Sequence, residues 1–193
     1  MNAVETFIGR FKCNHELCDG LIDYYNQNKK FQKPGEIGGN KIDKAMKEST
    51  DLVIHPDLER VPIIEEYFHH LEDCLEEYMK KYSALNKLYK FGLCEPFIIQ
   101  KYKPGQGFKQ EHCERVGVFD SSIKRVLVFM TYLNDVDDGG THFTYYNLTE
   151  KAQKGKTLIW CSDWTHTHRG QISETQEKII ATGWLSHQWD FQH

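Results

Sequence analysis

The sequence predicts an α+β fold, in which a helical front half packs on a β-sandwich or barrel formed by the second half. In the front half, apolar residues recur every three to four positions, as on one face of a helix. From residue 96 onward, short apolar runs alternate with turn residues at regular intervals, which is typical of antiparallel β-structure. The aromatic share, 13%, favours strands and supplies large side chains for a core.

Two helices are predicted in the front half. Residues 15–27 carry apolar side chains at helical spacing, and Asn14 is placed to cap the N-terminus of that helix. Residues 61–83 give a stronger pattern, because acids precede lysines along the polar face, as the helix dipole favours. Residues 29–60 contain Pro and Gly breakers, so they are predicted to form a loop. Long loops inside compact domains are commonly functional, which suggests a lid as a hypothesis.

The second half is predicted to consist of strands and turns. One turn is predicted at 103–107 and a hairpin turn at 135–140, where Asp138–Gly139 supplies residues that tolerate positive φ. The predicted strands are 96–102, 108–115, 124–134, 141–146, 156–161, 164–170 and 177–186. This series indicates a double-stranded β-helix, or jelly roll, with N-terminal helices packed on it. We expect a single domain over 1–193, with 1–95 as helical support and loop region and 96–186 as the core.

Composition excludes several classes of protein. The chain of 193 residues has a net charge of -4 and no basic stripe, so a nucleic-acid partner is not expected. No apolar run approaches the ~20 residues that a membrane span needs, and the N-terminus lacks the layout of a secretory signal. The six cysteines form no CxxC pair, which is typical of reduced thiols. We expect a cytoplasmic protein without a membrane partner.

One group of residues has the pattern of a metal site. His112 and Glu114 are separated by one residue, so on a strand both side chains point to the same face. A third ligand can come from His166 or His168, which also share a face, so geometry alone does not separate them. Two histidines and one carboxylate leave three positions open, which suits iron(II) in oxygen chemistry. The same ligands also suit catalytic zinc.

Lys178 lies ten residues after His168. If the two segments form a hairpin centred on Ser173, these residues are directly opposite each other, with their Cβ atoms about 5 Å apart. Ile179 and Ile180 indicate a buried strand, where an ammonium group needs an anionic partner. Lys178 is therefore predicted to meet an anion bound to the metal.

Taken together, residues 98–186 resemble the catalytic domain of prolyl 4-hydroxylases, within the iron(II)/2-oxoglutarate-dependent dioxygenase family. The stretches that carry the resemblance are, in order, IIQKYKPGQGF, HCE, VFMTYLNDVDDGGTHF, KGKTLIW, HRGQISETQEK and IIATGW. Each stretch alone is unspecific, whereas their order and spacing together are specific. The one departure is Glu114, because the family usually has Asp at that position. This departure leaves open a catalytically inactive jelly-roll binding module.

The resemblance implies both a reaction and the residues that serve it. The implied reaction is 2-oxoglutarate- and O2-dependent hydroxylation of an aliphatic C–H bond, in a prolyl residue of a peptide or protein or in a related amino acid. The implied cofactors are Fe(II), 2-oxoglutarate as cosubstrate, and ascorbate. The implied residues are, for the metal, His112, Glu114 and His168, and, for the cosubstrate, Lys178, Tyr102, Thr131 and Trp184. A zinc hydrolase with a His2Glu site is the other alternative, but it gives Lys178 no role.

Overall fold

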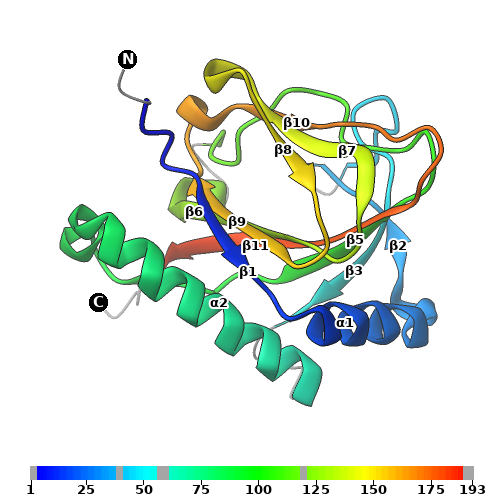
Figure 1. Cartoon of the computed structure of the whole chain (residues 1–193), viewed down its shortest axis with the longest axis horizontal. Helices are drawn as coiled ribbons and strands as arrows, with labels where there is room; N and C mark the ends of the chain where they lie inside the picture. The colour runs from blue at the N-terminus through cyan, green and yellow to red at the C-terminus, as the bar shows by residue number, and fades with distance from the viewer. Residues whose placement is uncertain (1–3, 38–40, 56–60, 118–120, 189–193) are drawn as a thin grey trace.

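The computed structural model describes residues 4–37, 41–55, 61–117 and 121–188. Two antiparallel sheets face each other, and two α-helices lie against the outer face of the larger sheet (Figure 1). This arrangement confirms the predicted α+β fold, a double-stranded β-helix with N-terminal helices packed on it. Within the residues described, neither helix has a stretch apolar enough to span a lipid bilayer.

The larger sheet has eight strands in the described part of the chain. In spatial order they are β1 (Gly9–Lys12), β9 (Lys156–Cys161), β6 (Arg125–Tyr132), β11 (Lys178–His187), β5 (Phe97–Tyr102), β3 (Thr50–Ile54) and β2 (Lys33–Pro34), with β4 (Phe91–Gly92) paired to β11. The predicted strands at 96–102, 124–134, 156–161 and 177–186 are confirmed as β5, β6, β9 and β11. The predicted turn at 103–107 is also present, and Gly105 has a φ of 80° there, a conformation that favours glycine.

The smaller sheet has three strands in the described part of the chain, in the order β10 (His168–Gly170), β7 (Val136–Phe143) and β8 (Leu148–Ala152). The predicted strands at 141–146 and 164–170 are right only in part, because 144–146 and 164–166 form short 3-10 helices. Strands β1 and β8 were missed, since polar side chains on their exposed faces leave no apolar run in the sequence.

Both predicted helices are confirmed. Helix α1 (His15–Gln27) begins after Asn14, whose side chain accepts a hydrogen bond from the Glu16 backbone N–H at 2.9 Å. Helix α2 (Pro62–Lys81) begins with Pro, whose missing N–H costs nothing in the first turn. Both helices pack on the larger sheet through a buried apolar cluster that includes Leu21 and Tyr67.

Strand β6 separates this cluster from a second one between the two sheets. Leu127 and Phe129 face the helices, whereas Met130 and Tyr132 face the smaller sheet. Alternate residues of a strand point to opposite faces, so from Leu127 onward every other residue of β6 faces the space between the sheets. The candidate site lies in that space.

The predicted loop at 29–60 is wrong in part, because it contains strands β2 and β3. Residues 50–54 form β3, which pairs with β5 inside the larger sheet. Leu52 and Ile54 are buried there, so this five-residue run has the two-residue period of a strand, which the neighbouring glycines and Pro34 obscure. Gly38 and Gly39, two of the glycines in the segment suggested as a lid, lie outside the described residues.

The predicted hairpin turn at 135–140 is also wrong. Strand β7 runs through these residues, and it belongs to a different sheet from β6, so the chain crosses between the sheets here. Neither Gly139 nor Gly140 has a positive φ. A Cβ atom on Gly140 would lie less than 3.0 Å from the Glu150 carbonyl oxygen on β8. The glycine is therefore needed for the close approach of β8 and not for a turn.

Two further predictions about the site segments are wrong. Residues 108–115 form no strand, only isolated bridges from Phe108 to Lys47 and from His112 to His168. The hairpin centred on Ser173 does not form, because β10 pairs with β7 whereas β11 pairs with β5 and β6. His168 and Lys178 consequently reach the site from opposite sheets.

Candidate metal and cosubstrate site

The site occupies a cavity of about 620 Å³ between the two sheets. Strand β10 contributes His168 from the smaller sheet, and β11 contributes Lys178 from the larger sheet. The irregular segment 108–116 contributes His112 and Glu114. Part of the segment proposed as a lid also lines the cavity, at Glu36, Ile37, Met46 and Lys47.

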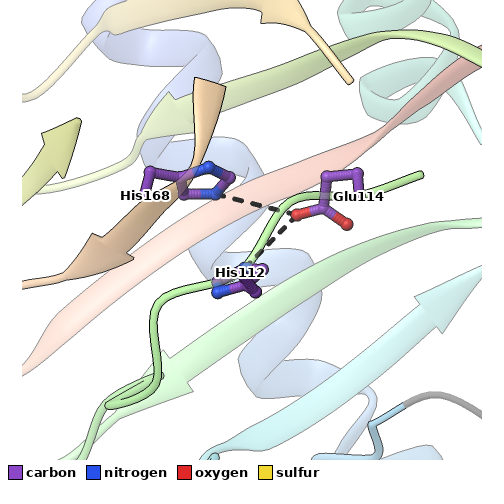
Figure 2. Close-up of side chains that lie close together, drawn as sticks. All are labelled: His112, Glu114 and His168. Carbon is purple, nitrogen blue, oxygen red and sulfur yellow. Dashed lines mark ion pairs between the residues drawn. The ribbon is translucent and has the colours of Figure 1, made fainter. Parts of the chain in front are cut away.

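Three candidate metal ligands converge in this cavity (Figure 2). The Nε2 atoms of His112 and His168 lie 3.4 and 3.7 Å from Oε1 of Glu114. One ligand atom from each residue lies within 4.8 Å of the other two. Ligands bound about 2.1 Å from one ion lie roughly 3 Å apart when they are adjacent, so these spacings are close to those of a metal site.

Hydrogen bonds on the far side of each ring prepare the two histidines for a metal. His112 Nδ1 lies 2.9 Å from the Gln110 carbonyl oxygen, and His168 Nδ1 lies 2.8 Å from the His166 carbonyl oxygen. A carbonyl oxygen only accepts, so each Nδ1 carries a proton, and in the neutral form of either ring the lone pair lies on Nε2. Two lone pairs and a carboxylate oxygen that face one another repel unless a cation lies between them. The residues present therefore fit a divalent metal.

Main-chain hydrogen bonds hold the irregular segment in place. The His112 N–H donates to the His168 carbonyl oxygen at 3.0 Å, and the His168 N–H donates back at 2.9 Å. The Glu114 and Arg115 N–H groups both donate to the Ser162 carbonyl oxygen, each at 3.1 Å. The segment is thus attached to β10 and to the end of β9, which brings His112 and Glu114 to one point although they do not lie on a strand.

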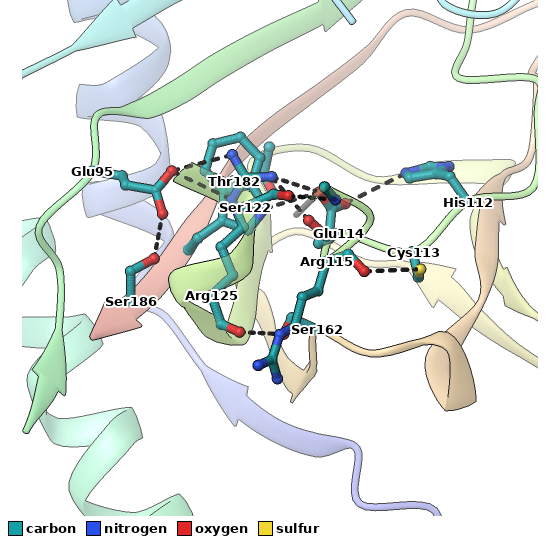
Figure 3. A network of polar contacts seen from close by, with 12 residues as sticks. Glu95, His112, Cys113, Glu114, Arg115, Ser122, Arg125, Ser162, Thr182 and Ser186 are labelled. Carbon is teal, nitrogen blue, oxygen red and sulfur yellow. Dashed lines mark hydrogen bonds and ion pairs between the residues drawn. The ribbon is translucent and has the colours of Figure 1, made fainter. Parts of the chain in front are cut away.

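The second carboxylate oxygen of Glu114 is held by the protein (Figure 3). Trp184 Nε1 donates to Oε2 at 2.9 Å. Arg125 Nη1 lies 3.6 Å from the same atom. Burial raises the pKa of Glu114, but His112, His168 and Arg125 together outweigh burial and lower it to about 2. The carboxylate is therefore ionised at neutral pH, as a metal ligand must be.

Burial also sets the charge of His168. Burial first and the neighbouring His112 second lower the pKa of His168 to about 4, against the opposing effect of Glu114. The ring is neutral at pH 7, which leaves Nε2 free to bind a metal. The ring packs against Trp160 and Phe143, with centroid distances of 5.1 and 5.6 Å, so it is held by apolar side chains.

The structure separates the two histidines that the sequence left equivalent. His166 is 3% exposed, and its Nε2 lies 3.0 Å from the Thr6 carbonyl oxygen, where it donates. Its ring thus faces the N-terminal segment, while its carbonyl oxygen accepts from His168. His168, and not His166, lies beside His112 and Glu114.

Lys178 is buried in the same cavity, with 5% of its surface exposed. Its Nζ donates to the carbonyl oxygens of Gly139 and Gln171, at 3.0 and 2.8 Å. Burial lowers its pKa to about 8, although Asp138 acts in the opposite direction. Among the residues that the structure describes, no carboxylate forms an ion pair with this ammonium group. The surroundings of Lys178 therefore suit an anionic ligand, which would supply the missing counter-charge.

Tyr102 lies across from Lys178 on β5, and its ring is 5.2 Å from Lys178 Nζ. Its hydroxyl donates to Gln100 Oε1 at 2.6 Å, while the Gln100 amide donates to Asp51 at 3.5 Å. Burial, followed by Asp51 and Glu114, raises the pKa of Tyr102 well above its usual value. A cosubstrate carboxylate would therefore compete with Gln100 for the hydroxyl proton.

The prediction that Thr131 lines the cosubstrate pocket is wrong. Its side chain faces α2, where Oγ1 accepts from the Tyr67 hydroxyl at 2.9 Å and lies 2.8 Å from Thr157 Oγ1. The next residue, Tyr132, lines the cavity instead, and its hydroxyl lies 2.6 Å from Thr141 Oγ1. The alternation of faces along β6 distinguishes the two positions, but apolar residues on both faces hid it in the sequence.

Comparisons with known proteins agree with this geometry. A sequence model of the 2OG-Fe(II) oxygenase superfamily matches residues 97–186. No curated protein matches the chain by sequence. A viral collagen prolyl hydroxylase from Paramecium Bursaria Chlorella virus-1, solved as its 2OG complex, is 18% identical with a TM-score of 0.68, over 95% of this chain and 97% of that chain.

Two further solved structures are similar. A prolyl-4-hydroxylase from Pseudomonas putida is 14% identical with a TM-score of 0.70, over 94% of this chain and 93% of that chain. A Trichoplax adhaerens prolyl hydroxylase, solved with a hypoxia inducible factor peptide fragment, is 14% identical with a TM-score of 0.72, over 94% and 84% of the two chains. At these identities the likeness shows a shared fold. Residues 97–186 thus match the 2OG-Fe(II) oxygenase superfamily model, and the chain shares its fold with prolyl hydroxylases.

Proposed function

We propose that this protein is an Fe(II)/2-oxoglutarate-dependent dioxygenase that hydroxylates an aliphatic C–H bond. The observation that carries the proposal is the placement of two binding elements in one cavity. His112, Glu114 and His168 present three metal-ligand atoms within 4.8 Å of one another. Lys178 presents a buried ammonium group that has no carboxylate partner in the part of the chain that the structure describes. When bound, iron and 2-oxoglutarate supply the oxidising chemistry, and the protein supplies orientation and a dry cavity.

The residues of the cavity have separate roles in this proposal. His112, Glu114 and His168 bind the metal on one side and leave the remaining positions open. Lys178 binds the far carboxylate of 2-oxoglutarate through a charge-assisted hydrogen bond. Phe108 stacks on His112 at a centroid distance of 3.7 Å, and Trp160 covers His168, so apolar rings exclude water around both histidines.

A prolyl residue of a peptide or protein, or a related amino acid, is the proposed substrate. Support comes from the shared fold, since the similar structures are prolyl hydroxylases and one of them was solved with a peptide fragment. Four statements stay predictions from the sequence. They are the need for ascorbate, the cytoplasmic location, the single domain over 1–193, and the lack of a nucleic-acid or membrane partner.

Zinc suits the same three ligands, so the experiment must separate a zinc hydrolase from an oxygenase. Fe(II) and 2-oxoglutarate are added without oxygen, and the metal-to-ligand charge-transfer absorption is recorded in the visible range. We expect the band in wild type and in His166→Ala, whose altered ring lies outside the site, and no band in His168→Ala. In Lys178→Ala the 2-oxoglutarate concentration for half-maximal absorption should rise more than about tenfold, because a buried charge loses its partner.

A folded, metal-loaded wild type without this band would reject the oxygenase. Zinc-dependent activity that needs no 2-oxoglutarate would then support the hydrolase, and a folded protein without turnover would support the inactive binding module. If the band appears, succinate release is measured with prolyl peptides and, separately, with free amino acids. Succinate release above the substrate-free rate with the peptides would support a prolyl residue as the substrate. Succinate release only with free amino acids would instead support an amino-acid substrate.

A further inference from the structure

Arg125 reaches the cavity because of an irregularity in β6. On a regular strand, consecutive side chains point to opposite faces. Val126 and Leu127 are consecutive, yet both pack against the apolar cluster beneath the helices. Leu185 pairs with Leu127 and Ser186 pairs with Arg125, so Val126 is an extra residue between two pairs. This β-bulge returns Arg125 to the cavity face, and bulges commonly re-aim a side chain in this way.

The Arg125 guanidinium is then held from several sides. Its Nη1 donates to the Glu114 carbonyl oxygen at 3.1 Å. Its Nε and Nη2 donate to Glu95 Oε2 at 3.3 and 3.1 Å, and the other Glu95 oxygen accepts from the Ser186 hydroxyl. Its Cζ lies 3.5 Å above the Trp184 ring. Arg125 therefore orients the Trp184 ring and also lies 3.6 Å from the Glu114 carboxylate.

This arrangement divides the two oxygens of Glu114 between two tasks. Oε1 faces both histidines, whereas Oε2 faces Trp184 and Arg125. The carboxylate thus spans the distance from the metal ligands to the indole N–H. An Asp side chain is shorter by one carbon–carbon bond, about 1.5 Å, so it would not reach both partners from the same backbone position.

We propose that Arg125 and Trp184 are positioning residues, which hold Oε2 of Glu114 so that Oε1 alone binds the metal. This pair explains why the carboxylate ligand in this chain is Glu, where the family usually has Asp. The inference rests on the proposed function, because the proposed metal site is what the pair orients. Mutation of a residue that hydrogen-bonds to a metal ligand commonly lowers metal affinity by about 10–100-fold.

The test measures binding of Co(II) by calorimetry, together with the visible d–d spectrum of the bound Co(II). Trp184→Phe and Arg125→Lys should each weaken Co(II) binding by about 10–100-fold and change the spectrum. The matched controls are Trp164→Phe and Arg115→Lys. Trp164 is 66% exposed, and the Arg115 side chain pairs with Asp163 at 3.3 Å, so both controls should bind Co(II) within about twofold of wild type.

A double-mutant cycle tests the choice of Glu. Glu114→Asp should weaken Co(II) binding in wild type, and should weaken it much less in the Trp184→Phe background, because the indole bond is already lost there. Additive effects would overturn the link to Glu. Wild-type spectrum and affinity in both Trp184→Phe and Arg125→Lys would overturn the positioning role, and Arg125→Lys alone decides it if Trp184→Phe does not fold. A wild type that binds no Co(II) would instead reject the metal site, and the positioning role with it.

Discussion

Lys178 carries an ammonium group into the interior, where it donates to two main-chain carbonyl oxygens. Burial disfavours the charged form, so the pKa of Lys178 falls to about 8 in the free protein, although Asp138 opposes this change. An anionic ligand stabilises the charged form and raises the pKa again. The affinity for such a ligand must then depend on whether Lys178 is protonated before binding.

This linkage predicts how 2-oxoglutarate binding changes with pH. Below pH 8 the ammonium form dominates, and above pH 8 it is lost, so the affinity should fall by about tenfold between pH 7 and pH 9. The measurement is the dissociation constant of 2-oxoglutarate in the Co(II)-loaded protein, by anaerobic calorimetry. Lys178→Arg is the control, because a guanidinium stays charged over this range and should remove the dependence. An unchanged affinity in wild type from pH 7 to 9 would contradict a role for Lys178 in carboxylate binding.

Single residues of the site could be predicted from the sequence where few residue types can do the chemistry, as for metal ligands and for a buried cation. His112, Glu114, His168 and Lys178 lie in one cavity, as expected. The hairpin predicted to place Lys178 opposite His168 is wrong, because Lys178 lies on the larger sheet and His168 on the smaller one. Thr131 was misplaced because β6 is apolar on both faces, so the pattern of residues does not indicate which face borders the cavity.

At the scale of elements, β7 and β8 approach each other closely beside the cavity. Gly140 lies against the Glu150 carbonyl oxygen of β8, and the Gly140 carbonyl oxygen accepts from the Gln171 N–H at 2.7 Å. The neighbouring Gly139 carbonyl oxygen accepts from Lys178. This part of β7 therefore supports the residue that would bind the cosubstrate.

Gly140→Ala should consequently destabilise the fold by about 1–3 kcal/mol, because the added Cβ meets a backbone atom that cannot rotate away. Gly92→Ala is the matched control. A Cβ there would lie 3.6 Å from the flexible Gln188 amide, so its effect should stay within about 0.5 kcal/mol. The measurement is the free energy of unfolding by chemical denaturation. Equal stability of the two variants would mean that β7 and β8 can separate at Gly140 without cost.

Elements with a long, regular pattern were predictable, and the elements that position the site were less so. Helices α1 and α2 were found from their own periodicity, because local spacing determines which face is buried. Residues 108–115 have no such period, since their conformation depends on hydrogen bonds to His168 and Ser162. Those partners are distant in the sequence, so no local pattern reveals them.

For the whole molecule, the fold class followed from the order of helices and strands, whereas the assignment of strands to sheets did not. Strands β6 and β7 are consecutive in the sequence but belong to different sheets, and β1 at the front pairs with β9 near the end. These pairings are set by the packing of two layers. The candidate site is built across both layers, with His168 on the smaller sheet and Lys178 on the larger one.

A ligand that bridges the two sheets should stabilise the whole fold against unfolding. At 100 times its dissociation constant, 2-oxoglutarate contributes about 2.7 kcal/mol, which corresponds to a rise in Tm of about 5–10 °C for a chain of this size. We expect this rise in the Co(II)-loaded wild type under anaerobic calorimetric scanning, and little rise in Lys178→Ala at the same concentration. Pyruvate is the control ligand, because it has the keto acid but no second carboxylate, so its effect should be equal in both proteins. A 2-oxoglutarate shift that survives Lys178→Ala would place the far carboxylate elsewhere in the cavity and remove the bridge between the sheets.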